Sequence, residues 1–513
     1  MDSLTPRDYQ KTILETTKRA NTLVVLPTGI GKTLIALLLT MHRLGEHRPS
    51  KALILAPTKP LVEQHYATFK KNLPELFAEL NLFTGEVPAK ERKELWRTSD
   101  LIFSTPQCVA NDLKKTRYDL SEVSLLVIDE AHRCLKNYDY TTVVNYYKNQ
   151  ALNQRILGLT ASPGSDYDIV KKICENLAIE EVEIRSRESN DVKPYVHELT
   201  FNKIEAIFPP EFIEPKTLLK RLHQGFVDEL KSRSLLFGPT NKISLLKLQT
   251  NLARQANSGN GNAMYGMSLC AQAIKIAHAI ELIETQTLTG TKTYLEGLLK
   301  QAEEKKTKGV QRLVKTPEFQ AAYLSITKLK ESGKEHPKIE KIVELVNEEL
   351  EKNSEAKLLL FTQFRETANQ IVEKLKKKEL VKPSIFIGQA KKENGGMSQK
   401  EQKRVIEQFK TGEINVLCAT SIGEEGLDIP EVNAVIFYEP IPSAIRKIQR
   451  AGRTARHAPG KLFILITKDT KDEISHYASN AREKKMYKTI NQVKETIKNE
   501  KTGKKFKTLG DFK

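Results

Sequence analysis

The segment VVLPTGIGKTLIALLL, residues 24–39, is the part of the sequence that indicates the fold most directly. An apolar, β-branched run leads into a loop with two glycines, and an apolar helical pattern leaves it, which predicts a strand, a loop and a helix. In such a loop the backbone N–H groups around Gly29 and Gly31 can bind phosphate oxygens, and Lys32 can reach the β and γ phosphates. The general pattern G-x-x-x-x-G-K-[ST] has a glycine where this chain has Leu26. A glycine turn before a core helix therefore stays open as the alternative.

The composition describes a chain large enough for two to four domains. Its 513 residues are 39% hydrophobic and 28% charged, as in globular proteins. The longest apolar run, near Leu34, is too short to cross a bilayer, and residues 1–10 lack the basic start and apolar core of a secretory signal. Five scattered cysteines contain no C-x-x-C pair, which argues against zinc ribbons and iron–sulfur clusters. We expect a cytoplasmic protein, associated with the nucleoid in a prokaryotic or archaeal cell.

The net charge of +18 is concentrated in two regions. Residues 216–330 hold 18 basic and 8 acidic residues, and residues 482–513 hold 11 basic and 4 acidic residues. A regional excess of this kind favours a polyanionic partner. Within the first region we predict a nucleic-acid contact, with a solvated helix end as the alternative, at Lys305, Lys306, Lys308, Arg312 and Lys315.

The order of the patterns predicts an α/β protein with an all-helical insertion. Short apolar runs alternate with helical patterns in the first 200 residues and again in residues 336–480, which indicates two parallel-sheet domains. The β pattern disappears over 205–335, where long helical patterns take its place. The basic tail, 481–513, is weakly periodic, and no fold is predicted for it.

Two carboxylates follow a predicted strand in the segment VIDEAH. The carboxyl edge of an open α/β sheet is where such sheets bind their ligands. Asp129 could coordinate Mg²⁺ together with Thr33, and Glu130 could orient and deprotonate the water that attacks a γ-phosphate. An acidic pair after a strand is common, so the pair gains its meaning from the phosphate-binding loop upstream.

The second α/β domain supplies the segment IQRAGRTARHAPG, with Gln449, Arg453 and Arg456. The two arginines are three residues apart and would share one face of a helical turn. Guanidinium groups brought across a cleft between domains could neutralise charge that develops on the γ-phosphate. A basic helix that binds a phosphate backbone or only solvent is the alternative.

These elements, in this order, resemble helicase superfamily 2 over nearly all of residues 1–480. The matching segments are PRDYQ, PTGIGKT, APTKPLV, STPQ, DEAH, TAS, FTQFRET, ATSIGEEGLDIPE and QRAGRTAR. The resemblance implies two RecA-like domains that bind ATP and Mg²⁺, with Leu26 as a normal variant. It implies ATP contacts at Arg7, Gln10, Thr28, Gly29, Ile30, Gly31, Lys32, Thr33, Gly426 and Asp428. It also implies nucleic-acid contacts at Pro57, Thr58, Thr105, Thr362 and Thr420, and coupling through Thr160 and Ser162.

Within the superfamily, the DEAHR, LTASP and GEEGLDIPE segments and the helical insertion resemble the archaeal Hef and eukaryotic FANCM branch. The resemblance implies an ATP-dependent DNA helicase or translocase that acts on forked or branched DNA in replication-fork repair. RNA-sensing helicases and Dicer have a similar insertion, so a double-stranded RNA translocase remains an alternative. A scaffold with a vestigial ATPase is a second one, disfavoured because Lys32, Glu130 and the arginines are all present.

The terminal segment KTLGDFK bears on a further partner. Leu509 and Phe512 fit the sliding-clamp pattern Q-x-x-[LIM]-x-x-[FY]-[FY], whereas Phe506 replaces the glutamine and Lys513 the second aromatic residue. Clamp binding is therefore a weak prediction, set against a disordered basic end.

Overall fold

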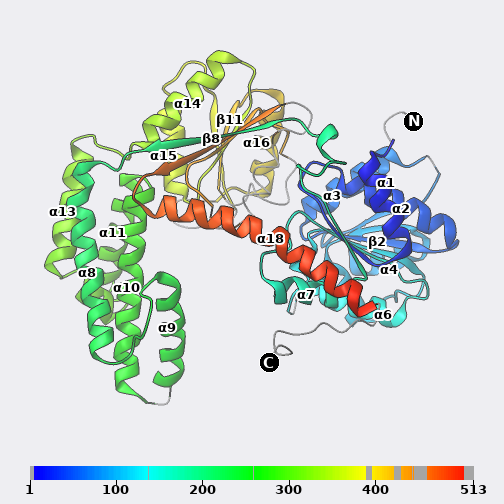
Figure 1. Ribbon diagram of the computed structural model, residues 1–513, viewed down its shortest axis with the longest axis horizontal. Coiled ribbons are helices and arrows are strands. Elements are labelled where there is room, and N and C mark those ends of the chain that lie inside the picture. Colours follow the sequence, from blue (N-terminus) through cyan, green and yellow to red (C-terminus); the bar gives the residue numbers. More distant parts are fainter. Residues whose placement is uncertain are drawn as a thin grey trace, which may run out of the picture.

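The protein has two parallel β-sheets and a bundle of helices between them in sequence (Figure 1). The computed structural model describes residues 5–74, 76–136, 138–257, 259–388, 396–420, 429–441, 443, 454 and 459–501. The predicted α/β class, with two parallel-sheet domains and an all-helical insertion, is confirmed.

The first α/β domain is built on a seven-stranded parallel sheet in the order β3-β4-β2-β5-β6-β1-β7. Most of its strands are buried apolar runs, as expected of a sheet covered on both faces. The strands are β1 (Thr22–Val25), β2 (Lys51–Leu55), β3 (Leu80–Phe83), β4 (Leu101–Ser104), β5 (Val123–Ile128), β6 (Ile156–Thr160) and β7 (Glu181–Ile184). The helices are α1 (Asp8–Arg19), α2 (Lys32–Glu46), α3 (Lys59–Asn72), α4 (Ala89–Thr98), α5 (Pro106–Lys114), α6 (Asp139–Gln150) and α7 (Tyr167–Asn176).

The second α/β domain has a six-stranded parallel sheet in the order β10-β11-β9-β12-β13-β8. Its strands are β8 (Leu199–Ala206), β9 (Leu358–Phe361), β10 (Pro383–Phe386), β11 (Val416–Ala419), β12 (Ala434–Phe437) and β13 (Gly460–Thr467). Its described helices are α14 (Lys338–Lys352), α15 (Arg365–Leu375) and α16 (Gln399–Thr411), and two apolar clusters fill the two sides of the sheet.

The helical insertion surrounds one long apolar helix. Its members are α8 (Ile213–Ser232), α9 (Lys242–Ala256), α10 (Gly261–Thr285), α11 (Leu288–Glu303), α12 (Lys308–Leu313) and α13 (Pro317–Glu331). Among the described residues, α10 is the one helix with the length and composition of a membrane span. It packs against α8 and α9 and buries Leu269, Ala273 and Ile276 in the cores of the bundle, so its apolar residues are those of a core helix.

Two segments differ from the domain limits expected from the sequence. The first domain was expected to include residues 199 and 200, but β8 begins at Leu199 and pairs along its whole length with β13 at the edge of the second sheet. The tail after residue 480, for which no fold was predicted, is helical up to Lys501 in α18 (Lys471–Lys501). Three of its side chains, Met486, Ile490 and Val493, are buried in a core cluster of the first domain, and this burial stabilises the helix.

Candidate nucleotide and nucleic-acid site

The phosphate-binding loop joins β1 to α2, as the sequence predicts. Gly29 and Gly31 have φ angles of 84° and 81°, in the left-handed region that favours glycine. A Cβ atom on Gly31 would lie 2.2 Å from Nε2 of Gln10 and would displace that side chain, which adds to the preference for glycine set by the positive φ. Lys32 Nζ donates a hydrogen bond to the carbonyl of Leu26 at 3.0 Å. Leu26 thus takes part in holding the lysine across the loop.

The loop presents donors of the kind that a phosphate group requires. Gly31 is the residue before α2, so the loop leads directly into the N-terminus of that helix, the end that favours anions. The hydroxyl of Thr28 is buried and, among the described residues, has no hydrogen-bond partner. Thr33 is the second residue of α2. The donor set therefore fits a polyphosphate.

The residues of the PRDYQ segment lie against this loop. Gln10 accepts from the backbone N–H of Arg7 at 2.8 Å, and its Nε2 donates to the carbonyl of Gly31 at 3.4 Å. The guanidinium of Arg7 donates to the carbonyl of Tyr195 at 3.2 Å and lies 5.4 Å from the centroid of that tyrosine ring. Tyr9 donates to the carbonyl of Ile30 at 2.7 Å. The segment therefore supports the loop from one side, with Tyr195 as a partner that the sequence did not identify.

Asp129 and Glu130 follow β5 at the carboxyl edge of the first sheet and are nearly buried. Asp129 Oδ2 lies 2.9 Å from Nε2 of His65, and Oδ1 accepts from the backbone N–H of Glu130 at 2.9 Å. Tyr140 donates to the carbonyl of Asp129 at 2.7 Å. Burial opposes ionisation of Asp129, but the hydrogen bond and charge of His65, together with Lys32, keep the pKa of its carboxyl below the ordinary value. Asp129 is thus ionised and placed to bind a cation.

Mg²⁺ would be held by few protein ligands. Among the described residues there is no group of three His, Cys, Asp or Glu side chains that could hold a metal ion. Mg²⁺ commonly binds through one or two carboxylates together with substrate phosphates and water. The ionised Asp129 beside the loop fits that mode, with Thr33 as the second predicted ligand.

A chain of close contacts joins Glu130 to the TAS segment. Glu130 Oε2 lies 3.2 Å from Nδ1 of His132, which lies 3.2 Å from the hydroxyl of Thr160. That hydroxyl accepts from the backbone N–H of Ser162 at 3.2 Å. Ser162 Oγ in turn lies 2.7 Å from Sδ of Met486 in α18. The two residues predicted to couple hydrolysis to movement are therefore in contact with both the DEAH segment and α18.

The four threonines predicted to contact nucleic acid each follow the end of a strand. Thr58 and Thr105 come after β2 and β4, which are neighbours in the first sheet, and each precedes a helix. Pro57 lies between β2 and Thr58. Thr362 and Thr420 come after β9 and β11, which are neighbours in the second sheet. The fold therefore gathers these residues in pairs at the carboxyl edges of the two sheets.

Thr362 is also tied to the helical insertion. Its hydroxyl lies 3.4 Å from the carboxylate of Glu439, which accepts from Nε2 of Gln286 at 3.3 Å. The same glutamine accepts from the hydroxyl of Thr367 at 2.9 Å. Thr362 is fully buried in this network. Its hydroxyl is therefore engaged with Glu439 in the described conformation, and its contact with nucleic acid stays a prediction.

The five basic residues predicted in the insertion surround α12 and are exposed. Lys305 and Lys306 lie in the turn before α12, and Lys308 begins the helix. Lys306 Nζ lies 2.7 Å from the carboxylate of Glu304, which lowers the pKa of that carboxyl. Arg312 and Lys315 lie at the other end of the helix. Exposure is compatible with the predicted contact and with a solvated helix end.

Several predicted site residues lie outside the described residues. These are Gly426 and Asp428 of the GEEGLDIPE segment, Gln449, Arg453 and Arg456 of the QRAGRTAR segment, and Leu509 and Phe512 of the terminal segment. Their roles remain predictions from the sequence.

Three protein-family models match successive parts of the chain. Residues 7–170 match the DEAD/DEAH box helicase model, and residues 337–458 match the helicase conserved C-terminal domain. Residues 214–333 match a model of the helical bundle of a candidate ATP-dependent RNA helicase. The three matches follow the two sheet domains and the insertion.

The chain is similar to a solved structure and to curated proteins. The helicase domain of Pyrococcus furiosus Hef is 41% identical, with a TM-score of 0.71, over 93% of this chain and 99% of that one. A Methanocaldococcus jannaschii protein named as a candidate ATP-dependent RNA helicase is 38% identical over 96% of this chain. An ATP-dependent DNA helicase of Neurospora crassa is 36% identical over 91% of this chain. The matches span 61% and 41% of the length of these two curated relatives.

Proposed function

Because the chain belongs to the superfamily 2 helicases of the Hef branch, we propose that it is an ATP-dependent DNA translocase or helicase that acts on forked or branched DNA in replication-fork repair. One observation carries the ATPase part of the proposal. The phosphate-binding loop, the ionised Asp129 and the buried Glu130 meet at one edge of the first sheet. This combination of a phosphate cradle, a cation ligand and a carboxylate base is what hydrolysis of a nucleoside triphosphate requires.

In the proposed reaction, each residue at this edge has a distinct role. The N–H groups at the start of α2, the Thr28 hydroxyl and Lys32 bind the phosphates and fix their position. Mg²⁺, when bound by Asp129 and Thr33, would neutralise charge between the β and γ phosphates. Glu130 holds the attacking water and accepts its proton, and a protonated His132, 3.2 Å away, pairs with the Glu130 carboxylate.

The proposed nucleic-acid groove follows the carboxyl edges of the two sheets. Backbone N–H groups and hydroxyls after β2 and β4 in the first domain can bind phosphates without contacting bases, and in the second domain the Thr420 hydroxyl after β11 can do the same. The Thr362 hydroxyl after β9 is held by Glu439 and is not part of this set. Since α3 and α5 both begin directly after Thr58 and Thr105, two helix N-termini support this binding. We therefore expect binding that is independent of sequence.

The choice of DNA over RNA rests on the relatives. The solved relative is a Hef helicase domain and the Neurospora crassa relative is a DNA helicase, whereas the Methanocaldococcus jannaschii relative bears an RNA helicase name. Duplex RNA therefore remains the second candidate substrate, because phosphate contacts do not distinguish the two.

ATPase assays on the whole chain with matched nucleic acids test the proposal. Forked DNA, linear duplex DNA and duplex RNA of equal length are compared at one salt concentration, because affinity depends strongly on salt. Stronger stimulation by forked DNA than by the other two supports the proposal. Stronger stimulation by duplex RNA would favour the second candidate. Binding without any stimulated hydrolysis would point to a scaffold with a vestigial ATPase.

A further inference from the structure

Helix α18 physically connects the two α/β domains. In Figure 1 it runs from the second sheet and the helical insertion across to the first domain. It contacts β13 and α10 near its start and α7 and β7 near its end. Its 31 residues contain neither glycine nor proline, and at a rise of 1.5 Å per residue they span about 46 Å. No position in its sequence is therefore a built-in hinge.

The start of α18 is fixed to the second domain and to the insertion by a set of contacts that we call the second-domain anchor (Lys338, Asp472, Lys471). Lys338 Nζ lies 2.8 Å from Asp472 Oδ2, and both side chains are almost fully buried. The same carboxylate oxygen accepts from the backbone N–H of Thr467 at 3.1 Å. Lys471 Nζ lies 2.8 Å from Glu281 of α10. The N-terminal end of α18 is therefore attached to both the second sheet and the insertion.

The far half of α18 is fixed to the first domain by the first-domain anchor (Met486, Ile490, Val493). These three side chains are at most 1% exposed and belong to the same apolar cluster as residues of α7. Thr489 donates to the carbonyl of Ser165 at 3.3 Å, just after the TAS segment. Burial of three apolar side chains makes this a stable attachment rather than a surface contact.

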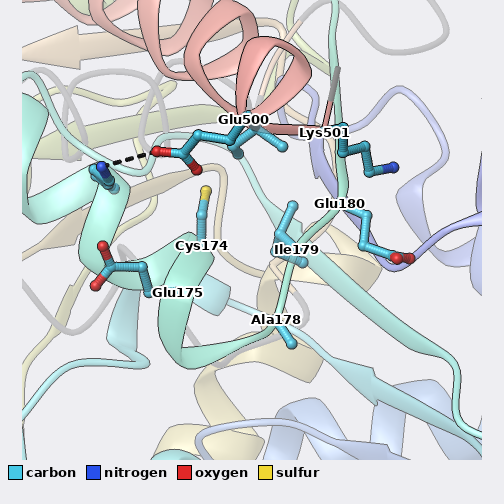
Figure 2. A pocket seen from close by; sticks show the side chains of 9 residues that line it. Cys174, Glu175, Ala178, Ile179, Glu180, Glu500 and Lys501 are labelled. Carbon is cyan, nitrogen blue, oxygen red and sulfur yellow. Dashed lines mark hydrogen bonds and ion pairs between the residues drawn. The ribbon is translucent and has the colours of Figure 1, made fainter. Parts of the chain in front are cut away.

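The last turns of α18 extend the attachment along α7 and β7. The hydroxyls of Tyr167 and Thr496 lie 3.0 Å apart. Figure 2 shows Glu500 directed at α7, where it forms a 3.2 Å ion pair with Lys171 beside a pocket of 340 Å³ that Cys174 and Ile179 help to line. Between the anchors, Ala481, Lys484 and Lys485 are exposed. The helix is thus held at both ends, and between the anchors one of its faces is exposed.

We propose that α18 is a strut that transmits movement of the second domain and the insertion to the hydrolysis site, with Met486 as a positioning residue for Ser162. Met486 Sδ lies 2.7 Å from Ser162 Oγ, and contacts of 3.2 Å lead from Ser162 through Thr160 and His132 to Glu130. A displacement of α18 along its axis therefore shifts the segment that contacts His132, whose imidazole lies 3.2 Å from the Glu130 carboxylate. The coupling role rests on the proposed function, whereas the mechanical role does not.

The first experiment measures the distance between the domains. Spin labels are placed at Leu152→Cys in the first domain and Leu380→Cys in the second, because these side chains are 81% and 44% exposed. Cys108→Ser removes the one native cysteine that is not buried. A flexible Gly-Ser-Gly-Ser insertion after Lys484 interrupts the strut while both anchors stay intact, and Lys484→Ala is the matched control.

We expect the insertion to broaden the distance distribution at least about twofold, while the control keeps the narrow wild-type distribution. An insertion variant with the wild-type distance distribution would overturn the mechanical role of α18, whatever the chain does with nucleic acid.

On forked DNA, we expect strand displacement per ATP hydrolysed to fall about tenfold or more in the insertion variant. Displacement per ATP that equals the wild-type value would overturn the coupling role, provided that the wild type itself hydrolyses ATP on forked DNA.

The second experiment tests Met486. We expect Met486→Ala to lower kcat for ATP about tenfold with little change in KM, because the residue acts on the orientation of Glu130 and not on phosphate binding. Met486→Leu, which fills the same space, should restore most of the rate. A wild-type kcat in Met486→Ala would remove its positioning role.

Discussion

The buried ion pair between Lys338 and Asp472, at the N-terminal end of α18, predicts how much stability a single substitution removes. Lys338 and Asp472 have side chains that are 0% and 3% exposed, and their charged atoms lie 2.8 Å apart. Lys338→Met removes the ammonium and leaves Asp472 buried without its counter-charge. Breaking a buried pair in this way costs about 3–5 kcal/mol. For a domain of about 150 residues, each kcal/mol lowers the Tm by about 2–4 °C, so we expect a fall of about 6–20 °C.

The matched control is the exposed pair at the other end of the same helix. Lys171 and Glu500 are 35% and 60% exposed, so Lys171→Met should change stability by less than about 1 kcal/mol. Scanning calorimetry of the whole chain measures both variants. A fall in Tm no larger for Lys338→Met than for Lys171→Met would refute the assignment of the buried pair as a strong contact.

The pH dependence of the Lys338→Met variant follows from the remaining carboxyl. Burial, only partly opposed by Lys338, already raises the pKa of Asp472 in the folded protein. A carboxyl with a raised folded-state pKa stabilises the fold when it is protonated, and this contribution is lost as the pH rises through that pKa. Loss of the Lys338 charge raises the pKa further. The Tm deficit should therefore shrink as the pH is lowered from 8 towards 5, and a deficit that grows instead would contradict this account.

Three further predictions concern the site. Lys32→Ala and Glu130→Gln should each abolish hydrolysis, but only the first should weaken ATP affinity, because the second keeps the phosphate cradle; equal losses of affinity in equilibrium binding would show that these roles are wrong. Arg453→Ala and Arg456→Ala should lower kcat far more than nucleotide affinity, and normal turnover with a raised KM would instead make that arginine a binding group. The basic cluster consists of Lys305, Lys306, Lys308, Arg312 and Lys315. Replacing it by alanine should weaken binding of branched DNA and reduce the slope of log K against log salt concentration by about one unit per lost contact, with ATPase activity in the absence of DNA almost unchanged. Wild-type affinity and slope would show that the cluster is only a solvated helix end.

Much of the nucleotide site could be predicted because its functional residues lie close together in short segments of the sequence. The left-handed conformations of Gly29 and Gly31 and the place of Asp129 after a buried strand follow from local sequence patterns. His65 could not be found in the same way. It reaches Asp129 across 64 residues because β2 and β5 are neighbours in the sheet, and the order of strands is not a local property.

The edges of the domains were harder to predict than their centres. Central strands such as β5 are buried along their whole length and apolar except for Ser124, whereas most residues of β8 are exposed or half-buried and include Lys203 and Glu205. An edge strand has one neighbour and needs fewer apolar side chains, so its pattern resembles that of a linker. Its pairing with β13 depends on a partner about 260 residues further along the chain.

The sequence by itself determined the two parallel sheets, the helical insertion and the phosphate-binding edge, because each depends on hydrophobic period, glycine conformation and residue chemistry within a few turns of chain. Only the tertiary structure decided the course of α18. Its first half buries Asp472 against Lys338 and Thr467 of the second domain, and its second half buries Met486 and Ile490 against the first. A helix that packs its two halves on different domains has no continuous apolar stripe, so its periodicity is weak in the sequence although its anchors are buried.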